Sequence, residues 1–219
     1  MKKTFLMVVT AICLAVLSSC ASSIALSMYV SQRRTNTFSG SKDGYTVTVY
    51  CEERETPFIT DGYVGEMKNY LIIRLEKQGE ALKDASIFIS YDDVLVDASF
   101  KYNPLNGKYT AEEQVDRLPI TKTLNVEITD EDKQIKLTLN SLVLDDAIDV
   151  NKALKCVQNY DKEVINSLFK KGQIGTEIRV RLLCSDGRNY YYVGFANGKK
   201  TIAYLVDALT GEVLAKKDI

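Results

Sequence analysis

Short segments of alternating apolar and polar residues, separated by turn signals, dominate the middle of this 219-residue chain. Residues 45–51, 70–76, 86–91, 124–128 and 135–139 each gather apolar side chains on one face of a strand. Asn106-Gly107 and the charged run 130–132 are typical of the turns between such strands. About seven short strands at this spacing predict an antiparallel β-sandwich over residues 44–143.

The apolar period changes in residues 145–171, where it becomes helical. Asp149 can cap the start of this helix, Asp161 can begin a second one, and Gly172 suits the end. Three strands follow, joined at Asp186-Gly187 and Asn197-Gly198. The predicted fold class is therefore β-rich α+β: the N-terminal antiparallel sandwich, then a helix packed on a small antiparallel meander sheet over residues 144–219.

The first 19 residues have the parts of a secretory signal peptide: Lys2 and Lys3, an apolar run over 5–17, and two small serines. Residues 17–20, Leu-Ser-Ser-Cys, resemble the lipobox of bacterial lipoproteins. That resemblance implies cleavage before Cys20, a lipid anchor on this cysteine that includes palmitate, and a place in the cell envelope. Because Ala21 follows rather than Asp, it implies the outer membrane where a bacterium has two membranes.

Two other interpretations of the N-terminus are an uncleaved spanning helix over residues 5–30 and a soluble secreted protein. The polar run 18–23 and the positive Arg33 and Arg34 argue against the spanning helix. Residues 31–43 are rich in Ser, Thr, Asn, Arg and Gly and lack apolar periodicity. Residues 20–43 are therefore predicted to be a lipidated N-terminus and a flexible tether.

Two further resemblances concern the predicted domains. Residues 71–89, with the later Asn-Gly-Lys-Tyr of 106–109, resemble immunoglobulin-like sandwiches of bacterial envelope proteins, which implies a fold and no function. Residues 207–214, Asp-x-x-Thr-Gly-Glu-Val-Leu, follow the aromatic strand 190–195 and resemble the end of the PepSY domain. This second resemblance implies binding or restraint of a partner protein outside the cytoplasm, often a peptidase.

Five cysteines occur in the sequence, of which Cys13 lies in the leader and Cys20 is the expected lipid site. The strand that carries Cys184 should turn its apolar face toward the helix that carries Cys156. A disulfide between Cys156 and Cys184 is one prediction, and two small buried thiols are the alternative. With Cys51 included, the count is odd, so at least one thiol stays unpaired.

Histidine is absent from the sequence, which removes the usual general base and the commonest zinc ligand. No catalytic residue, metal or cofactor is predicted, and a net charge of -1 without a long basic run indicates no nucleic-acid partner. The expected function is non-catalytic binding of another extracytoplasmic protein, with a peptidase as one candidate. The alternatives are a structural or assembly component of an envelope complex and a carboxylate-dependent hydrolase.

Three consecutive tyrosines, Tyr190, Tyr191 and Tyr192, are the candidate partner-binding residues. On a strand, Tyr190 and Tyr192 point to one face and Tyr191 to the other. One set should pack against the helix, and the other should half-cover an open sheet face. The segment from Asp207 to Glu212 is interpreted as a structural turn, in which Asp207 accepts backbone hydrogen bonds and Gly211 takes a positive φ.

Overall fold

The structure is a computed structural model that describes residues 25–57, 63–79, 82, 84–104, 107–170, 173–198 and 200–219. The leader and Cys20 lie outside the described residues. Strands make up 62% of the described residues and helices 12%. Within the described ranges, none of the helices has the length and apolar content needed to span a bilayer.

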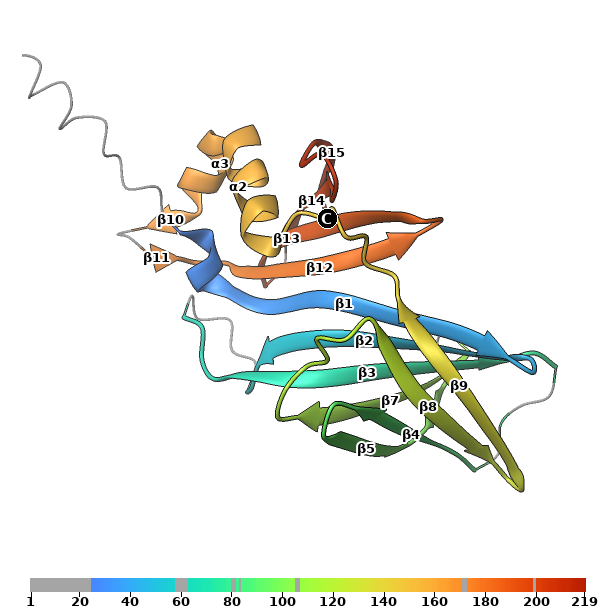
Figure 1. Ribbon diagram of the computed structural model, residues 1–219. Helices are drawn as coiled ribbons and strands as arrows, with labels where there is room; N and C mark the ends of the chain where they lie inside the picture. Colours follow the sequence, from blue (N-terminus) through green and yellow to red (C-terminus); the bar gives the residue numbers. More distant parts are fainter. Residues whose placement is uncertain are drawn as a thin grey trace, which may run out of the picture.

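The first nine strands wrap into a nearly closed, barrel-like sheet in the order β5-β4-β8-β9-β1-β2-β3-β7-β6 (Figure 1). Their bounds are β1 Val30–Lys42, β2 Tyr45–Glu55, β3 Met67–Lys77, β4 Ala85–Tyr91, β5 Val94–Ser99, β6 Lys101–Asn103, β7 Lys108–Val115, β8 Thr123–Asp130 and β9 Lys133–Ser141. Their inward side chains form the first hydrophobic core, with Phe38, Val49, Ile73, Ile87 and Leu139 almost fully buried.

A second core forms where helices pack on strands of the C-terminal part of the chain. The short 3-10 turn η1 (Leu26–Tyr29) and the helices α2 (Val150–Tyr160) and α3 (Lys162–Ser167) lie on one side of β12 (Glu177–Ser185), β13 (Arg188–Asn197) and β14 (Lys200–Asp207). The small hairpin β10 (Phe169–Lys170) and β11 (Gln173–Ile174) follows the helices, and β15 (Val213–Asp218) is the last strand. Helix α2 begins where the Asp149 side chain accepts a hydrogen bond from the Lys152 amide at 2.7 Å.

The predicted fold class is wrong because the two parts do not form a sandwich followed by a separate meander. Strand β1 pairs in parallel with β12, so the described strands outside the β10–β11 hairpin join into one 13-stranded sheet. Strand β1 also contributes to both cores, through Phe38 in the first and Val30 in the second. Alternation predicted which face of each strand is buried, but it carries no information about which strand lies beside it.

The predicted flexible tether is also wrong for residues 30–42, which form β1. Asp43 and Gly44, with φ of 51° and 82°, make the two-residue turn that pairs β1 with β2. The polar side chains of β1 are satisfied by its neighbour, since Arg33 pairs with Glu53 and Arg34 with Glu52. A strand whose polar residues find partners across the sheet needs no apolar periodicity to be stable.

Other local predictions are confirmed. Asp186 and Gly187, with φ of 51° and 71°, form the turn between β12 and β13. The helical segment breaks at Asp161, which precedes α3 as expected. Strands β12, β13 and β14 pair antiparallel in chain order, but β12 also pairs with β1, so they are part of the larger sheet and not the separate small meander that was predicted.

Candidate functional site

The three tyrosines of β13 divide between the two faces of the sheet as predicted. Tyr191 is only 4% exposed, and its hydroxyl donates to the carbonyl oxygen of Ile148 at 2.9 Å. Burial raises the pKa of Tyr191 to about 12. Tyr191 therefore belongs to the second core, while Tyr190 and Tyr192 are half-buried on the opposite face. Of the three tyrosines, only Tyr190 and Tyr192 therefore remain candidates for binding a partner.

Tyr192 lies flat along its own strand. A Cβ atom built on Gly194 would come within 2.6 Å of the Tyr192 hydroxyl oxygen, so the ring uses the space that the glycine leaves open. Across the strand pair, Tyr192 lies opposite Arg181 and Gly194 lies opposite Arg179. The tyrosine that the sequence singled out therefore borders a group of arginines.

These arginines and several tyrosines form a continuous surface that we call the arginine–tyrosine face. It is turned away from both hydrophobic cores and crosses β13, β12, β1, β2 and β3. Guanidinium groups stack on its aromatic rings: Arg34 lies 4.2 Å from the Tyr50 ring centroid, and Arg54 lies 4.0 Å from that of Tyr70. The residues of the face are Arg34, Tyr50, Arg54, Tyr70, Arg179, Arg181 and Tyr192.

Carboxylates hold most of these arginines in place. Glu52, only 1% exposed, pairs with Arg34 at 3.1 Å. Glu177 binds Arg179 with both carboxylate oxygens, and Glu112 on β7 binds Arg54 in the same way. Such forked pairs fix the planes of the guanidinium groups. The face is therefore rigid before any partner binds.

Arg181 differs from its neighbours because it forms no ion pair with a carboxylate in the described part of the chain. Its Nε and Nη2 both donate to the side-chain oxygen of Gln32, at 3.2 and 2.7 Å. Burial and the nearby Arg34 lower the pKa of Arg181, and Arg179 lowers it further while Glu52 raises it. Arg181 is thus a crowded, partly desolvated cation held by a neutral amide.

A groove of about 370 Å³ opens beside Arg181. Arg54, Arg179 and Tyr70 of the arginine–tyrosine face line it, and so does Glu55, whose Oε1 accepts from the Gly65 amide at 2.7 Å. The full lining is Gln32, Arg54, Glu55, Thr56, Tyr70, Arg179 and Arg181. The groove presents donor groups from strands that are far apart in the sequence.

The sequence analysis identified Tyr190 and Tyr192 but missed the arginines. A signal was present in residues 45–55, where Tyr50, Glu52 and Arg54 occupy alternate positions on the face opposite the apolar residues. Arg34 lay in the segment interpreted as a tether. Only the parallel pairing of β1 with β12 brings Arg34 beside Arg181.

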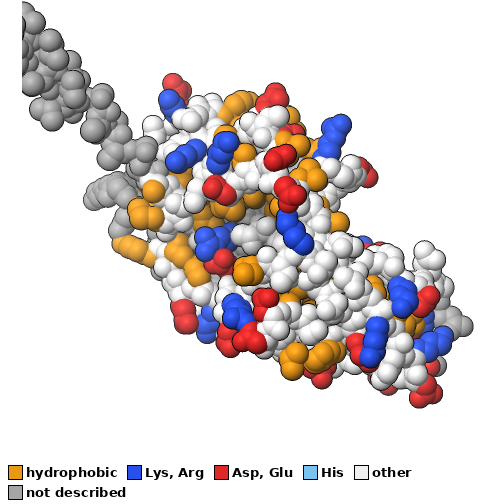
Figure 2. All heavy atoms as spheres, in the orientation of Figure 1, with side chains coloured by type: hydrophobic (Ala, Val, Ile, Leu, Met, Phe, Trp, Pro, Cys, Tyr) orange, Lys and Arg blue, Asp and Glu red, His pale blue; other side chains and the backbone are white. Residues whose placement is uncertain are grey.

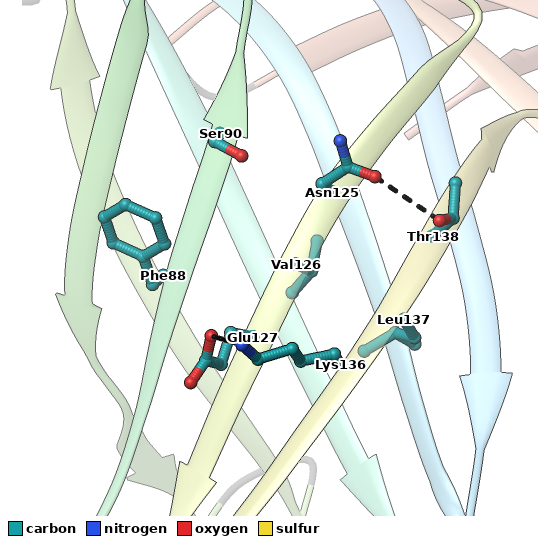
Figure 3. A pocket seen from close by; sticks show the side chains of 8 residues that line it. All are labelled: Phe88, Ser90, Asn125, Val126, Glu127, Lys136, Leu137 and Thr138. Carbon is teal, nitrogen blue, oxygen red and sulfur yellow. Dashed lines mark hydrogen bonds and ion pairs between the residues drawn. The ribbon is translucent and has the colours of Figure 1, made fainter.

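A second depression lies on the outer surface of β4, β8 and β9 (Figure 3). Its polar groups pair with one another: Lys136 with Glu127 at 3.2 Å, and Thr138 with Asn125 at 3.4 Å. Phe88 is 40% exposed at its side. The charged groups of this depression are already paired across neighbouring strands, so it is the weaker candidate for a binding site. It serves below as the control surface.

The face of the molecule drawn in Figure 2 is mixed in charge. Figure 2 shows Lys and Arg side chains beside Asp and Glu side chains over much of the visible face. No cluster of three or more His, Cys, Asp or Glu residues suited to a metal ion occurs among the described residues. A local excess of positive charge, such as that at Arg181, therefore stands out against a balanced background.

Cys156 and Cys184 are free thiols in this structure, and the disulfide between them stays a prediction. Both are half-buried. The Cys156 sulfur faces the Gly211 turn, whereas the Cys184 side chain interacts with Thr37 of β1. Cys51, on the inner face of β2, is also free and is fully buried.

The turn from Asp207 to Glu212 has the structural role expected of it. The Asp207 carboxylate accepts from the amides of Leu209 and Thr210, both at 2.8 Å. These backbone hydrogen bonds lower the pKa of Asp207. Gly211 has a φ of +77°, as predicted. The motif builds a turn and adds no group to the arginine–tyrosine face.

No protein-family model matches this chain, and no curated protein or solved structure shows significant similarity to it. The lipobox, immunoglobulin-like and PepSY-like resemblances therefore stay predictions.

Proposed function

We propose that this protein is a lipid-anchored envelope protein that binds another extracytoplasmic protein without catalysing a reaction. The contact surface is the arginine–tyrosine face, with Arg181 near its centre and Tyr192 at its β13 border. The observation that carries this proposal is the array of guanidinium groups stacked on tyrosine rings across β1, β2 and β3. Tyrosine and arginine are the side chains enriched at protein interfaces and among their strongest contributors.

Rigidity supports the same proposal. Arg54 and Arg179 are held by forked pairs with Glu112 and Glu177, and Tyr192 rests in the space over Gly194. Binding to side chains that are already ordered loses less conformational entropy, so more of the contact energy appears as affinity. A surface that keeps long side chains fixed in the free protein suits recognition of a partner of defined shape.

The titratable groups support binding rather than acid–base catalysis. The sequence offers no histidine, and the alternative of a carboxylate-dependent hydrolase would need a general-acid carboxyl group with a raised pKa. The described carboxyl groups with a clearly shifted pKa, Asp130, Asp145, Asp161 and Asp207, all have it lowered. Burial raises the pKa of Asp130, but hydrogen bonds from Lys77 and Tyr45 lower it more. These groups serve as structural acceptors.

Anchoring at Cys20 would place the second core close to the membrane. Only residues 21–24 separate Cys20 from Ala25, and Leu26 is buried beneath helix α2 in the next turn. Five peptide links span at most about 18 Å when fully extended. The η1 and α2 end would therefore lie near the bilayer.

Two measurements test the proposal. Intact-mass analysis of the membrane-extracted protein is expected to show loss of residues 1–19 and added acyl mass, both abolished in Cys20→Ala. Capture from detergent-solubilised envelopes of the host bacterium is expected to retain a partner that Tyr192→Ala loses and Phe88→Ala keeps. Truncation of an aromatic anchor at an interface commonly costs about 2 kcal/mol of binding energy. Equal capture by both folded variants would argue against this surface.

A further inference from the structure

The centre of the arginine–tyrosine face holds one more cation than its carboxylates neutralise. Arg34 and Arg181 occupy paired positions in the parallel strands β1 and β12, and Arg179 precedes Arg181 on the same face. The two nearby carboxylates are already engaged, Glu52 with Arg34 and Glu177 with Arg179. Of these three guanidinium groups, that of Arg181 is the one for which the described residues provide no anionic partner.

This excess positive charge lowers the stability of the free protein, which suggests that its role is to bind a ligand. Like charges at short range repel each other, and partial burial removes the water that would screen them. The Arg34 Nε atom is also buried without a hydrogen-bond partner. A protein interior seldom leaves a buried donor of this kind unsatisfied, because each such group costs stability. An incoming anion beside Arg181 would offset the repulsion between the guanidinium groups.

We propose that Arg181, with Arg179 and Arg54 along the same groove, binds a carboxylate of an acidic segment in the partner protein. This inference rests on the proposed function and names the chemistry of the partner. Gln32 holds the Nε and Nη2 side of Arg181, which leaves the other terminal nitrogen, Nη1, free to donate. The groove beside it runs past Arg54 and Tyr70, so an extended chain can lie across the strands.

The groove also contains one carboxylate, which does not oppose the proposal. Glu55 is 4% exposed, and its Oε1 accepts from the Gly65 amide. Glu55 therefore fixes the chain at the end of β2, while the three arginines provide the donors.

The test uses the full-length protein in non-ionic detergent and fluorescence anisotropy of labelled hexaglutamate at low salt. Wild type is expected to bind hexaglutamate saturably and hexaglutamine at least about tenfold more weakly. Arg181→Met is expected to lower the affinity for hexaglutamate about tenfold or more, whereas Arg188→Met, which removes an exposed cation at the β12–β13 turn, stays within about twofold. Arg181→Lys keeps the charge but loses the forked geometry, and is expected to lose affinity several-fold.

Four outcomes would overturn the proposal. They are equal loss of affinity in Arg181→Met and Arg188→Met, equal binding of hexaglutamate and hexaglutamine, no saturable binding of hexaglutamate, and displacement by inorganic phosphate at far lower concentration than by acetate. Urea unfolding provides a separate check. Arg181→Met should be at least as stable as wild type, because it removes a crowded cation, and a clearly lower midpoint would make Arg181 a structural residue.

This result can be separated from the proposed function. Loss of partner capture in Tyr192→Ala together with no effect of Arg181→Met on hexaglutamate would keep the binding face and reject the acidic ligand. Binding of hexaglutamate through Arg181 without any captured partner would keep the carboxylate site and reject the proposed protein partner.

Discussion

Gly211, in the turn before β15, lies directly against Cys156 of helix α2. A Cβ atom built on Gly211 would be 2.8 Å from the Cys156 sulfur, and the Gly211 backbone has a φ of +77°. The turn and the helix can therefore pack this closely only because Gly211 has no side chain. Neither residue contributes to the arginine–tyrosine face, so this contact reports on stability alone.

Gly211→Ala is expected to destabilise the protein by about 2 kcal/mol. The left-handed backbone costs a residue with a Cβ about 1–2 kcal/mol, and contact with the Cys156 sulfur adds to it. The double variant Gly211→Ala, Cys156→Ala should regain only the steric part. Urea unfolding measures both, with Gly175→Ala as the control, since no atom lies within 4 Å of that position. Equal stability of the Gly211 and Gly175 variants would contradict this account of the turn.

Phe38→Ala tests whether β1 is a structural strand. Phe38 is fully buried in the first core, so its truncation is expected to cost about 3–5 kcal/mol. Ser41→Ala, at an exposed position of the same strand, should change stability little. Chemical unfolding compares the two. A flexible tether over residues 31–43 would instead predict no effect from either substitution.

Alkylation tests the state of the thiols. In the native protein Cys51 should not react, because burial raises its pKa to about 12 and hides the sulfur. After unfolding without a reductant, Cys51, Cys156 and Cys184 should all carry the label in a peptide digest. Labelling of Cys51 alone would instead reveal a bond between Cys156 and Cys184.

The hydrogen-bonded group of Asp161, Tyr204 and Lys216 predicts a pH-dependent contribution to stability. Asp161 accepts from Lys216 at 2.6 Å and from Tyr204 at 2.9 Å, and the Lys216 hydrogen bond lowers the pKa of Asp161. A carboxyl group with a lowered pKa stabilises the fold fully above its unfolded pKa of about 4. This contribution is lost as the pH falls through the folded value.

Asp161→Asn is therefore expected to cost about 1 kcal/mol at neutral pH and progressively less below about pH 4. Unfolding curves at pH 7 and pH 3, measured for both proteins, test this difference. Asp145→Asn, which removes an exposed pair with Lys122, is the matched control and should show a smaller effect. A cost for Asp161→Asn that does not change with pH would rule out the charged interaction.

The buried faces of the strands could be predicted from the sequence, because alternation reports directly on burial. Val47, Val49 and Cys51 were expected on one face, and all three are fully buried. The pairing of β1 with β12 could not be predicted, since it joins residues such as Ser31 and Ile178 that are 147 positions apart. The polar sequence of β1 adds to the difficulty, although Asp43-Gly44, directly after this strand, was a readable hairpin signal.

The candidate site was predictable only at its border. Tyr190 and Tyr192 are two positions apart on one strand, so the sequence of that segment alone showed that they share a face. Arg34, Arg54 and Arg181 come from three strands, and each looks like an ordinary surface residue in its own segment. Their common orientation depends on strand order and register, which short-range patterns do not encode.

Site-specific photo-crosslinking in living cells tests the central claim most directly. A photoreactive phenylalanine replaces Tyr192 in one variant and Phe88, beside the control surface, in another. We predict a discrete crosslinked species from position 192 that contains one envelope protein, with none from position 88, and its loss when Cys20→Ala removes the anchor. No crosslinked protein at position 192, or the same products from both positions, would contradict binding through the arginine–tyrosine face.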